Sequence, residues 1–253
     1  MQKLFAASLF MLLIVTTCIL VWQWDMYSDS KEAAASSGGV RQSVTISQGK
    51  DSIEITQTID SLPKGNYTIH NPMKAPFTLD GNGMSDNAVE IKKDGGSVTF
   101  AYALPLNANG NSKLFSNWAI GLNGVETVSS SVEITSEKGV KGSWGAAAKQ
   151  IGSVNKEYIH YVLFEKEGPL FPIFYEAGKL SYIRLEAGPY LYYPDDSTVN
   201  IPALENVFKS YDTLQDKTIL LTSNHPPSAG EEMLIMGNGN NAAMLKQTLT
   251  SQY

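Results

Sequence analysis

The sequence predicts a mainly β protein in which an N-terminal transmembrane helix is followed by an antiparallel β-sandwich and then by an α+β domain. Three observations lead to this prediction: a long uncharged segment near the N-terminus, a stretch in which hydrophobic residues alternate with polar ones, and a later change to a helical period. The expected parts are a transmembrane signal-anchor over residues 1–24, a flexible spacer over 25–41, the β-sandwich domain over 42–136 and the α+β domain over 137–253.

The expected membrane helix is the segment from Leu4 to Trp22, which carries no charged side chain. A helix of this length spans roughly 28 Å, close to the thickness of the hydrocarbon core of a bilayer. Lys3 precedes the segment, whereas Asp25 follows it. The positive-inside rule then predicts a single-pass protein of the cell membrane, with a cytoplasmic N-terminus and an extracytoplasmic C-terminal region.

Two other interpretations of this segment stay open. A cleaved signal peptide has the same charge pattern, but its apolar core is usually shorter and a small-residue cleavage site follows at once, whereas Ala33 to Ala35 lies well downstream. A lipoprotein signal would place small residues before Cys18 and polar residues after it, and neither is present. An uncleaved anchor is therefore the preferred interpretation, and whether the segment is cleaved stays open.

The next two segments differ in composition. Residues 25–41 are small and polar, which is typical of a flexible spacer. From Gln42 onwards, short runs rich in Val, Ile, Thr and aromatic residues alternate with Gly-, Asn- and Pro-containing turns. This pattern predicts about seven strands of an antiparallel β-sandwich that ends near residue 136.

The final part of the sequence mixes strand and helix patterns. We expect strands before and after residues 176–179, which are predicted to form a hairpin turn, and a short helix near residues 146–151. Apolar residues at 201, 204, 207, 208 and 211 lie on one face of a predicted helix, with Pro202 in its first turn. Residues 242–249 are predicted to form the last helix.

Composition and charge exclude several functions. The chain of 253 residues has a formal net charge of −6, and Arg41 and Arg184 are its only arginines. Nucleic-acid binding is not expected, because it depends on basic patches and on bidentate arginine contacts. Cys18 is the only cysteine and lies in the predicted membrane segment, so the region beyond it has neither disulfides nor a catalytic thiol.

The motifs that resemble catalytic signatures are incomplete. Ser61 and Lys64 match the S-x-x-K pattern, and Ser85 to Asn87 match S-D-N, but the K-T-G element is missing. Pro63 also favours a turn over the helix that would bring Lys64 to Ser61. A glycine- and asparagine-rich stretch at residues 237–241 lacks the lysine of a phosphate-binding loop. These patterns predict no catalytic residue and no cofactor.

Metal binding is not predicted either, although one loop leaves the question open. Asp80, Asn82 and Asp86 supply oxygen atoms at alternate positions, as calcium loops do, but the glycine and the final glutamate of an EF-hand are absent. Residues 80–87 are therefore interpreted as a turn, and calcium binding by them stays open. The histidines at 70, 160 and 225 each lack a nearby ligand, and His225 is the one candidate for a functional role, because it lies in a polar loop.

Tyrosine density is the most distinctive feature of the second domain. Such rings usually pack across the strands of a sheet, but an exposed set would form a platform for a partner. In the run from Tyr190 to Tyr193, Tyr190 and Tyr192 share one face of the strand. The predicted partner-binding residues are Tyr182, Tyr190, Tyr192 and His225.

Together these features predict a membrane-anchored extracytoplasmic protein that is non-catalytic and that binds or assembles with an envelope protein or glycan. The anchor, the spacer and the absence of a complete catalytic signature support this hypothesis. The alternative is an envelope hydrolase or transferase whose site is assembled from residues scattered along the sequence.

Overall fold

The structure is a computed structural model that describes Thr17 and residues 39–84, 88–106, 112–137, 139–140, 142–156, 159–186, 188–210 and 216–237. Apart from Thr17, the predicted membrane segment Leu4 to Trp22 lies outside these residues, as do most of the spacer and the helix predicted at residues 242–249. Among the described residues, no helix has the length and hydropathy needed to cross a bilayer.

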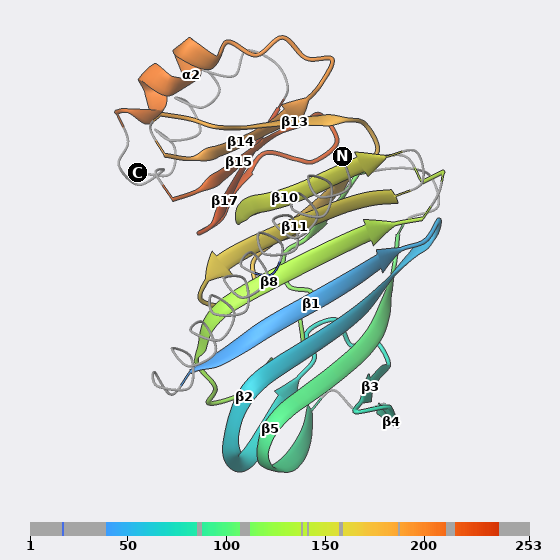
Figure 1. The fold of residues 1–253 in the computed structure, drawn as a ribbon. Coiled ribbons are helices and arrows are strands. Elements are labelled where there is room, and N and C mark those ends of the chain that lie inside the picture. The colour runs from blue at the N-terminus through green and yellow to red at the C-terminus, as the bar shows by residue number, and fades with distance from the viewer. Residues whose placement is uncertain are drawn as a thin grey trace, which may run out of the picture.

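The described residues form three sheets and one helix, so the predicted mainly β character is confirmed (Figure 1). Sheet A has nine strands, which are β1 (Val40–Gln48), β2 (Ser52–His70), β3 (Phe77–Leu79), β4 (Asn82–Met84), β5 (Ala88–Pro105), β7 (Gly121–Leu122), β8 (Thr127–Ser136), β10 (Lys149–Lys156) and β11 (Ile159–Glu167). Sheet B contains β6 (Lys113–Phe115), β9 (Ser143–Ala146) and β12 (Ile173–Glu176). Sheet C contains β13 (Leu180–Arg184), β14 (Tyr190–Pro194), β15 (Thr218–Leu221), β16 (Ser228–Ala229) and β17 (Met233–Met236), and the helix is α2 (Ile201–Phe208).

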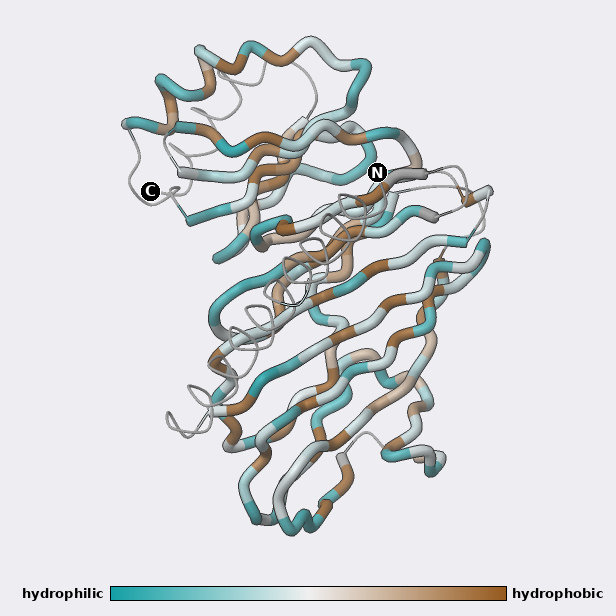
Figure 2. Tube along the Cα trace, viewed as in Figure 1, coloured by the Kyte–Doolittle hydropathy of each residue, from teal (hydrophilic) through white to brown (hydrophobic). Residues whose placement is uncertain are grey.

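Sheet A is built from the alternating sequences that predict strands. Along β1 and β2, buried aliphatic residues alternate with exposed or half-buried polar ones, and the same alternation is visible along the tube in Figure 2. Because successive side chains of a strand point to opposite faces, this pattern makes one face of the sheet hydrophobic and the other polar. The hydrophobic face packs into the main core, which also contains residues of sheet B.

The topology of sheet A differs from the prediction in two respects. β1 pairs with β8 in parallel, so the sheet is mixed and not wholly antiparallel. β10 and β11 continue the same sheet beyond β8, so the boundary expected at residue 137 does not separate two sheets. The first strand also begins at Val40, inside the segment predicted to be spacer. Hydrophobic alternation shows which residues form strands but not which strands become neighbours.

The buried side-chain amide of Gln57 in β2 links sheet A to Ile120, in the segment that follows β6 of sheet B. The side chain of Gln57 is fully buried; its Nε2 donates to the carbonyl of Ile120 at 2.6 Å and its Oε1 accepts from the amide of Ile120 at 3.0 Å. The hydroxyl of Tyr102 also donates to this Oε1. Since each buried polar atom has a partner, the cost of burying the amide is offset.

Sheet C is covered on both faces, which explains its continuous hydrophobic strands. Residues Tyr192, Leu220, Met233 and Ile235 on one face join the main core. On the other face, residues of the sheet form a second core with Leu204 and Phe208 of α2. The predicted helix is thus confirmed at Ile201–Phe208, with the Oδ1 of Asn200 capping its first turn.

Two local predictions near sheet C are wrong. Residues 146–151, predicted as a short helix, contain the end of β9 and the start of β10. The predicted hairpin turn at residues 176–179 instead connects β12 of sheet B to β13 of sheet C, so its flanking strands do not pair. In both places the chain passes from one sheet to another. Local propensity predicts a turn or a helix there but does not show which sheet the next strand joins.

Candidate functional site

A groove of about 1120 Å³ lies between the polar face of sheet A and the adjoining strand ends of sheet C. It crosses sheet A where β1, β8 and β10 begin and where β11 ends, and it reaches sheet C at the end of β13 and the start of β14 and β15. Its lining residues are Arg41, Gln42, Ser43, Asp60, Ser61, Ser129, Ser130, Ser131, Ala147, Ala148, Lys149, Glu165, Lys166, Glu167, Arg184, Gly188, Tyr190, Asp216 and Thr218. Hydroxyl and charged groups therefore dominate this surface.

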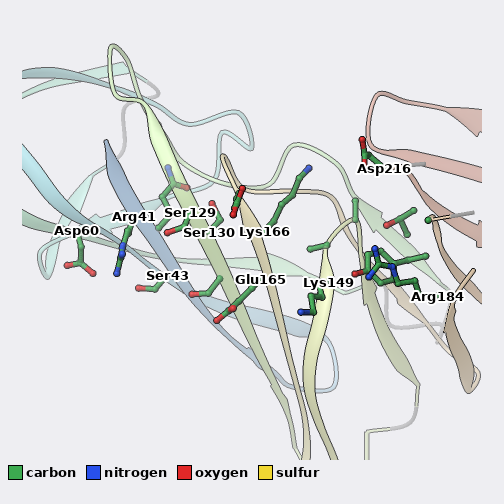
Figure 3. Close-up of a pocket in the computed structure, with 18 of the residues that line it drawn as sticks. Arg41, Ser43, Asp60, Ser129, Ser130, Lys149, Glu165, Lys166, Arg184 and Asp216 are labelled. Carbon is green, nitrogen blue, oxygen red and sulfur yellow. The ribbon is translucent and has the colours of Figure 1, made fainter. Parts of the chain in front are cut away.

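Both arginines of the chain line this groove, from opposite sides (Figure 3). Arg41 lies opposite Asp60 in the pairing of β1 with β2, whereas the guanidinium of Arg184 lies over the ring of Tyr190, 5.6 Å from its centre. A guanidinium binds carboxylate and phosphate groups with two parallel hydrogen bonds, which a lysine cannot do. The sequence contained this signal, since arginine is so rare in it, but the two positions are 143 residues apart and only the fold brings them together.

The remaining charges make the groove mixed in sign. Lys149 and Lys166 add positive charge, and the lining also includes Asp60, Glu165, Glu167 and Asp216. Lys166 forms an ion pair with Glu232, which reduces its availability to a ligand. A surface of this kind suits a partner with both acidic and basic or hydrogen-bonding groups better than a uniformly anionic polymer.

The three predicted tyrosines form a ladder that runs from the groove into the core. Tyr190 lines the groove and stacks on Tyr182, with ring centres 5.6 Å apart. Tyr182 contacts Tyr192 at 4.7 Å, and Tyr192 meets the edge of Phe174 at 5.1 Å. Only the outer end of this ladder is therefore at the candidate site.

The expectation that Tyr190 and Tyr192 form an exposed pair is wrong for Tyr192, which is 1% exposed. The two residues do point to the same face of β14, but that face of sheet C is covered at Tyr192 by the main core. Strand periodicity predicts which residues share a face, whereas the coverage of that face depends on the neighbouring sheet.

Tyr182 is half-buried between these two rings. Its hydroxyl accepts a hydrogen bond from the backbone amide of Gln150 at 3.4 Å, and this contact links sheet C to the edge strand β10. Burial raises the pKa of Tyr182 to about 12, an effect that the Gln150 hydrogen bond only partly opposes. The ring of Tyr182 is thus packed between Tyr190 on the groove side and Tyr192 on the core side.

His225, the fourth predicted residue, does not line the groove and lies in a polar cluster with buried Glu176, half-buried Ser112 and exposed Asn224. Its Nε2 is 3.8 Å from Oε1 of Glu176, whose side chain is 5% exposed. Oε2 of Glu176 accepts hydrogen bonds from the hydroxyl of Ser112 and, at 2.9 Å, from the amide of Asn224. Asn224 also donates to the Ser112 hydroxyl at 3.0 Å.

Sequence reasoning missed Glu176 because the residues from Glu176 to Lys179 were interpreted as an ordinary turn. The side chain is instead enclosed at the end of β12 by the loop that follows β15. A glutamate at the end of a hydrophobic strand was the only available signal, and nothing local distinguishes it from a solvent-exposed turn residue.

The other motifs gain no support as sites. Ser61 and Lys64 both lie in β2, so they are not on one turn of a helix, and Lys64 pairs with exposed Asp94. Both carboxylate oxygens of Asp80 are engaged, one by Lys93 and one by the backbone amide of Thr99. Residues 85–87 of the candidate calcium loop lie outside the described residues, so calcium binding there stays open.

No protein-family model matches the chain, and no curated protein matches it. Solved structures that resemble it include the M1 zinc metallopeptidase of Deinococcus radiodurans, at 11% sequence identity and a TM-score of 0.50, over 80% of this chain and 60% of that one. A mutant of that enzyme bound to a Tyr-Ser-Ala substrate matches at 10% identity and a TM-score of 0.49, over 80% and 61% of the two chains. This chain thus spans about 60% of the length of the enzymes it resembles. The likeness shows the fold alone.

Proposed function

We propose that this chain is a membrane-anchored extracytoplasmic protein of the cell envelope, and that it binds or assembles with its partner through the groove between sheets A and C. In this proposal the segment from Leu4 to Trp22 is the single membrane anchor, the N-terminus is cytoplasmic and the β-rich region is outside the cell. The role is binding and not catalysis.

The convergence of both arginines on one groove is the observation that carries the proposal. Guanidinium groups rank high among residues that contribute to binding energy, because they form charge-assisted hydrogen bonds in a fixed geometry. The hydroxyl-bearing residues Ser43, Ser129 and Ser131 line the same groove as the two arginines. They supply further donors and acceptors for a polar partner, either an envelope protein or a glycan that carries acidic groups.

In this proposal Tyr190, which lines the groove, contacts the partner, and Tyr182, which stacks on it, holds its ring in position. Tyr192 would act only through the packing of the ladder. The cation of Arg184 over the ring of Tyr190 restricts both side chains before a partner arrives, which lowers the entropic cost of binding.

The proposal is tested by replacing Arg184 and Tyr190 together with Ala in the full-length, detergent-solubilised protein. Solubilised envelope proteins and purified cell-wall glycan are the two probes for a pull-down. We expect at least tenfold weaker capture of the bound probe, with little change in melting temperature, because both residues border the groove. Tyr161→Ala is the matched control, since Tyr161 pairs with Thr135 on the same polar face of sheet A but does not line the groove.

Unchanged capture by the double variant would contradict the groove as the binding surface. Equal loss in the Tyr161→Ala control would show that the polar face as a whole, and not the arginine-lined groove, is responsible. Recovery of the chain in the soluble fraction, without detergent, would contradict the anchor.

An envelope hydrolase or transferase is the second candidate, and the cluster around Glu176 is the observation in its favour. The Ser112 hydroxyl donates to a buried carboxylate that could act as its general base. The imidazole of His225 approaches the other oxygen of this carboxylate, so the order of groups differs from that of a Ser-His-carboxylate triad. Any hydrolysis of ester or peptide substrates that disappears in Ser112→Ala would favour this candidate over the binding role.

A further inference from the structure

Two potential ligand atoms, each inaccessible to solvent, face one another without a hydrogen-bond partner. Oε1 of Glu176 and Nε2 of His225 are both buried, both lack a hydrogen bond, and they are 3.8 Å apart. A buried carboxylate oxygen without a partner costs free energy, so its retention calls for a compensating group.

The rest of the cluster holds the carboxylate in one orientation. Ser112 and Asn224 both donate to Oε2 of Glu176, so this oxygen is satisfied and Oε1 is directed towards His225. The backbone N–H of Asn224 donates to the hydroxyl of Thr222 at 3.0 Å, and this hydrogen bond helps to fix the loop that carries His225. This arrangement resembles the outer hydrogen bonds that orient metal-binding carboxylates.

We propose that Glu176 and His225 bind a divalent transition-metal ion of the zinc class between Oε1 and Nε2, with water completing its coordination. Imidazole nitrogen and carboxylate oxygen are both common ligands of such ions. Two atoms at about 2.1 Å from one zinc ion at a tetrahedral angle lie about 3.4 Å apart, so the side chains need to approach by about 0.4 Å.

The separation argues for a bridging ion over a direct contact. A charge-assisted hydrogen bond between an imidazolium and a carboxylate is about 2.7 to 2.9 Å long, and these two atoms are well beyond that. Among the described residues, no group of three or more His, Cys, Asp and Glu side chains could hold a metal. The site would thus have two protein ligands and weaker affinity than a four-ligand structural zinc site.

An ion bound at this site would connect sheet B to sheet C. Glu176 ends β12 of sheet B, and His225 lies in the loop that follows β15 of sheet C. A metal bound only when both ligands are in place stabilises the folded chain by mass action and ties the two sheets together. This inference does not depend on the groove or on its partner.

Titration of the metal-free, full-length protein in detergent with Zn²⁺, followed by calorimetry and by thermal unfolding, tests the site. We expect saturable binding of one ion and a rise of several degrees in melting temperature. His225→Ala should reduce the affinity at least tenfold and abolish the rise, and Glu176→Gln should do the same while keeping the hydrogen bonds to Ser112 and Asn224. Co²⁺ in place of Zn²⁺ adds a visible absorption spectrum that reports nitrogen ligation.

His70→Ala and His160→Ala serve as matched controls, because they remove the other two histidines of the chain and leave this cluster intact. The melting temperatures of the variants without metal establish that each is folded. Absence of saturable Zn²⁺ binding by the wild type would overturn the proposal, and so would wild-type affinity in His225→Ala. Loss of binding in His70→Ala or His160→Ala alone would assign the metal to another part of the surface.

Discussion

Replacement of Tyr192 by Ala should destabilise the protein severely, whereas the same replacement at Tyr190 should not. The two residues share a face of β14 and a common neighbour, Tyr182, so they differ chiefly in burial. Tyr192 is 1% exposed and also packs against the edge of Phe174, while Tyr190 borders the groove. Because both residues are tyrosines, the comparison of the two variants measures chiefly the effect of burial.

The expected magnitudes follow from these contacts. Truncation of a fully buried aromatic residue costs about 3–5 kcal/mol of unfolding free energy, because the removed ring leaves a cavity. Tyr190 loses one stacked ring and one cation contact, which together are worth about 1 kcal/mol at a partly exposed position. For a protein of this size the melting temperature falls by about 2–4 °C per kcal/mol, so Tyr192→Ala should lower it by roughly 6–20 °C and Tyr190→Ala by no more than about 4 °C.

Urea unfolding followed by tryptophan fluorescence measures both free energies on the same preparation. The slopes of the transitions should agree between variants, so that midpoints compare stabilities directly. A cost below about 1 kcal/mol for Tyr192→Ala would refute the burial of this ring and would restore the exposed tyrosine pair that the sequence alone suggested. A cost above about 3 kcal/mol for Tyr190→Ala would show that the groove residue belongs to the core.

Two further perturbations test the same region. Because the pKa of Tyr182 is raised from 10.0 to about 12 by burial, its contribution to stability is present below pH 10 and is lost as the pH rises towards 12; Tyr182→Phe should therefore flatten the fall of unfolding free energy measured between pH 9 and 11.5, and an unchanged profile would contradict the burial. Gly145→Ala should cost about 1–3 kcal/mol in urea unfolding, because the added Cβ would lie 2.2 Å from the ring of fully buried Phe174, and a neutral effect would show that this ring can move aside.

The local elements of this protein follow largely from its sequence. Segments between Val40 and Ser136 in which apolar and polar residues alternate form strands, because one face of each strand must be apolar to pack. Each segment shows this pattern in its own sequence. The helix at Ile201–Phe208 follows in the same way from its apolar stripe and from Pro202 in its first turn. The failed prediction of a helix at residues 146–151 shows the limit, since a run of small residues has little preference that packing cannot override.

The coverage of each surface and the contacts between distant residues depend on the tertiary structure. Arg41 and Arg184 share a groove because β10 and β11 extend the first sheet past residue 137 and bring it beside sheet C. Glu176 and His225 meet because β12 and the loop after β15 belong to different sheets that pack together. A periodic sequence specifies the face on which a side chain lies, but the burial of that face is a property of its neighbours. For this reason Tyr190 and Tyr192, equivalent in the sequence, lie at a groove and in a core.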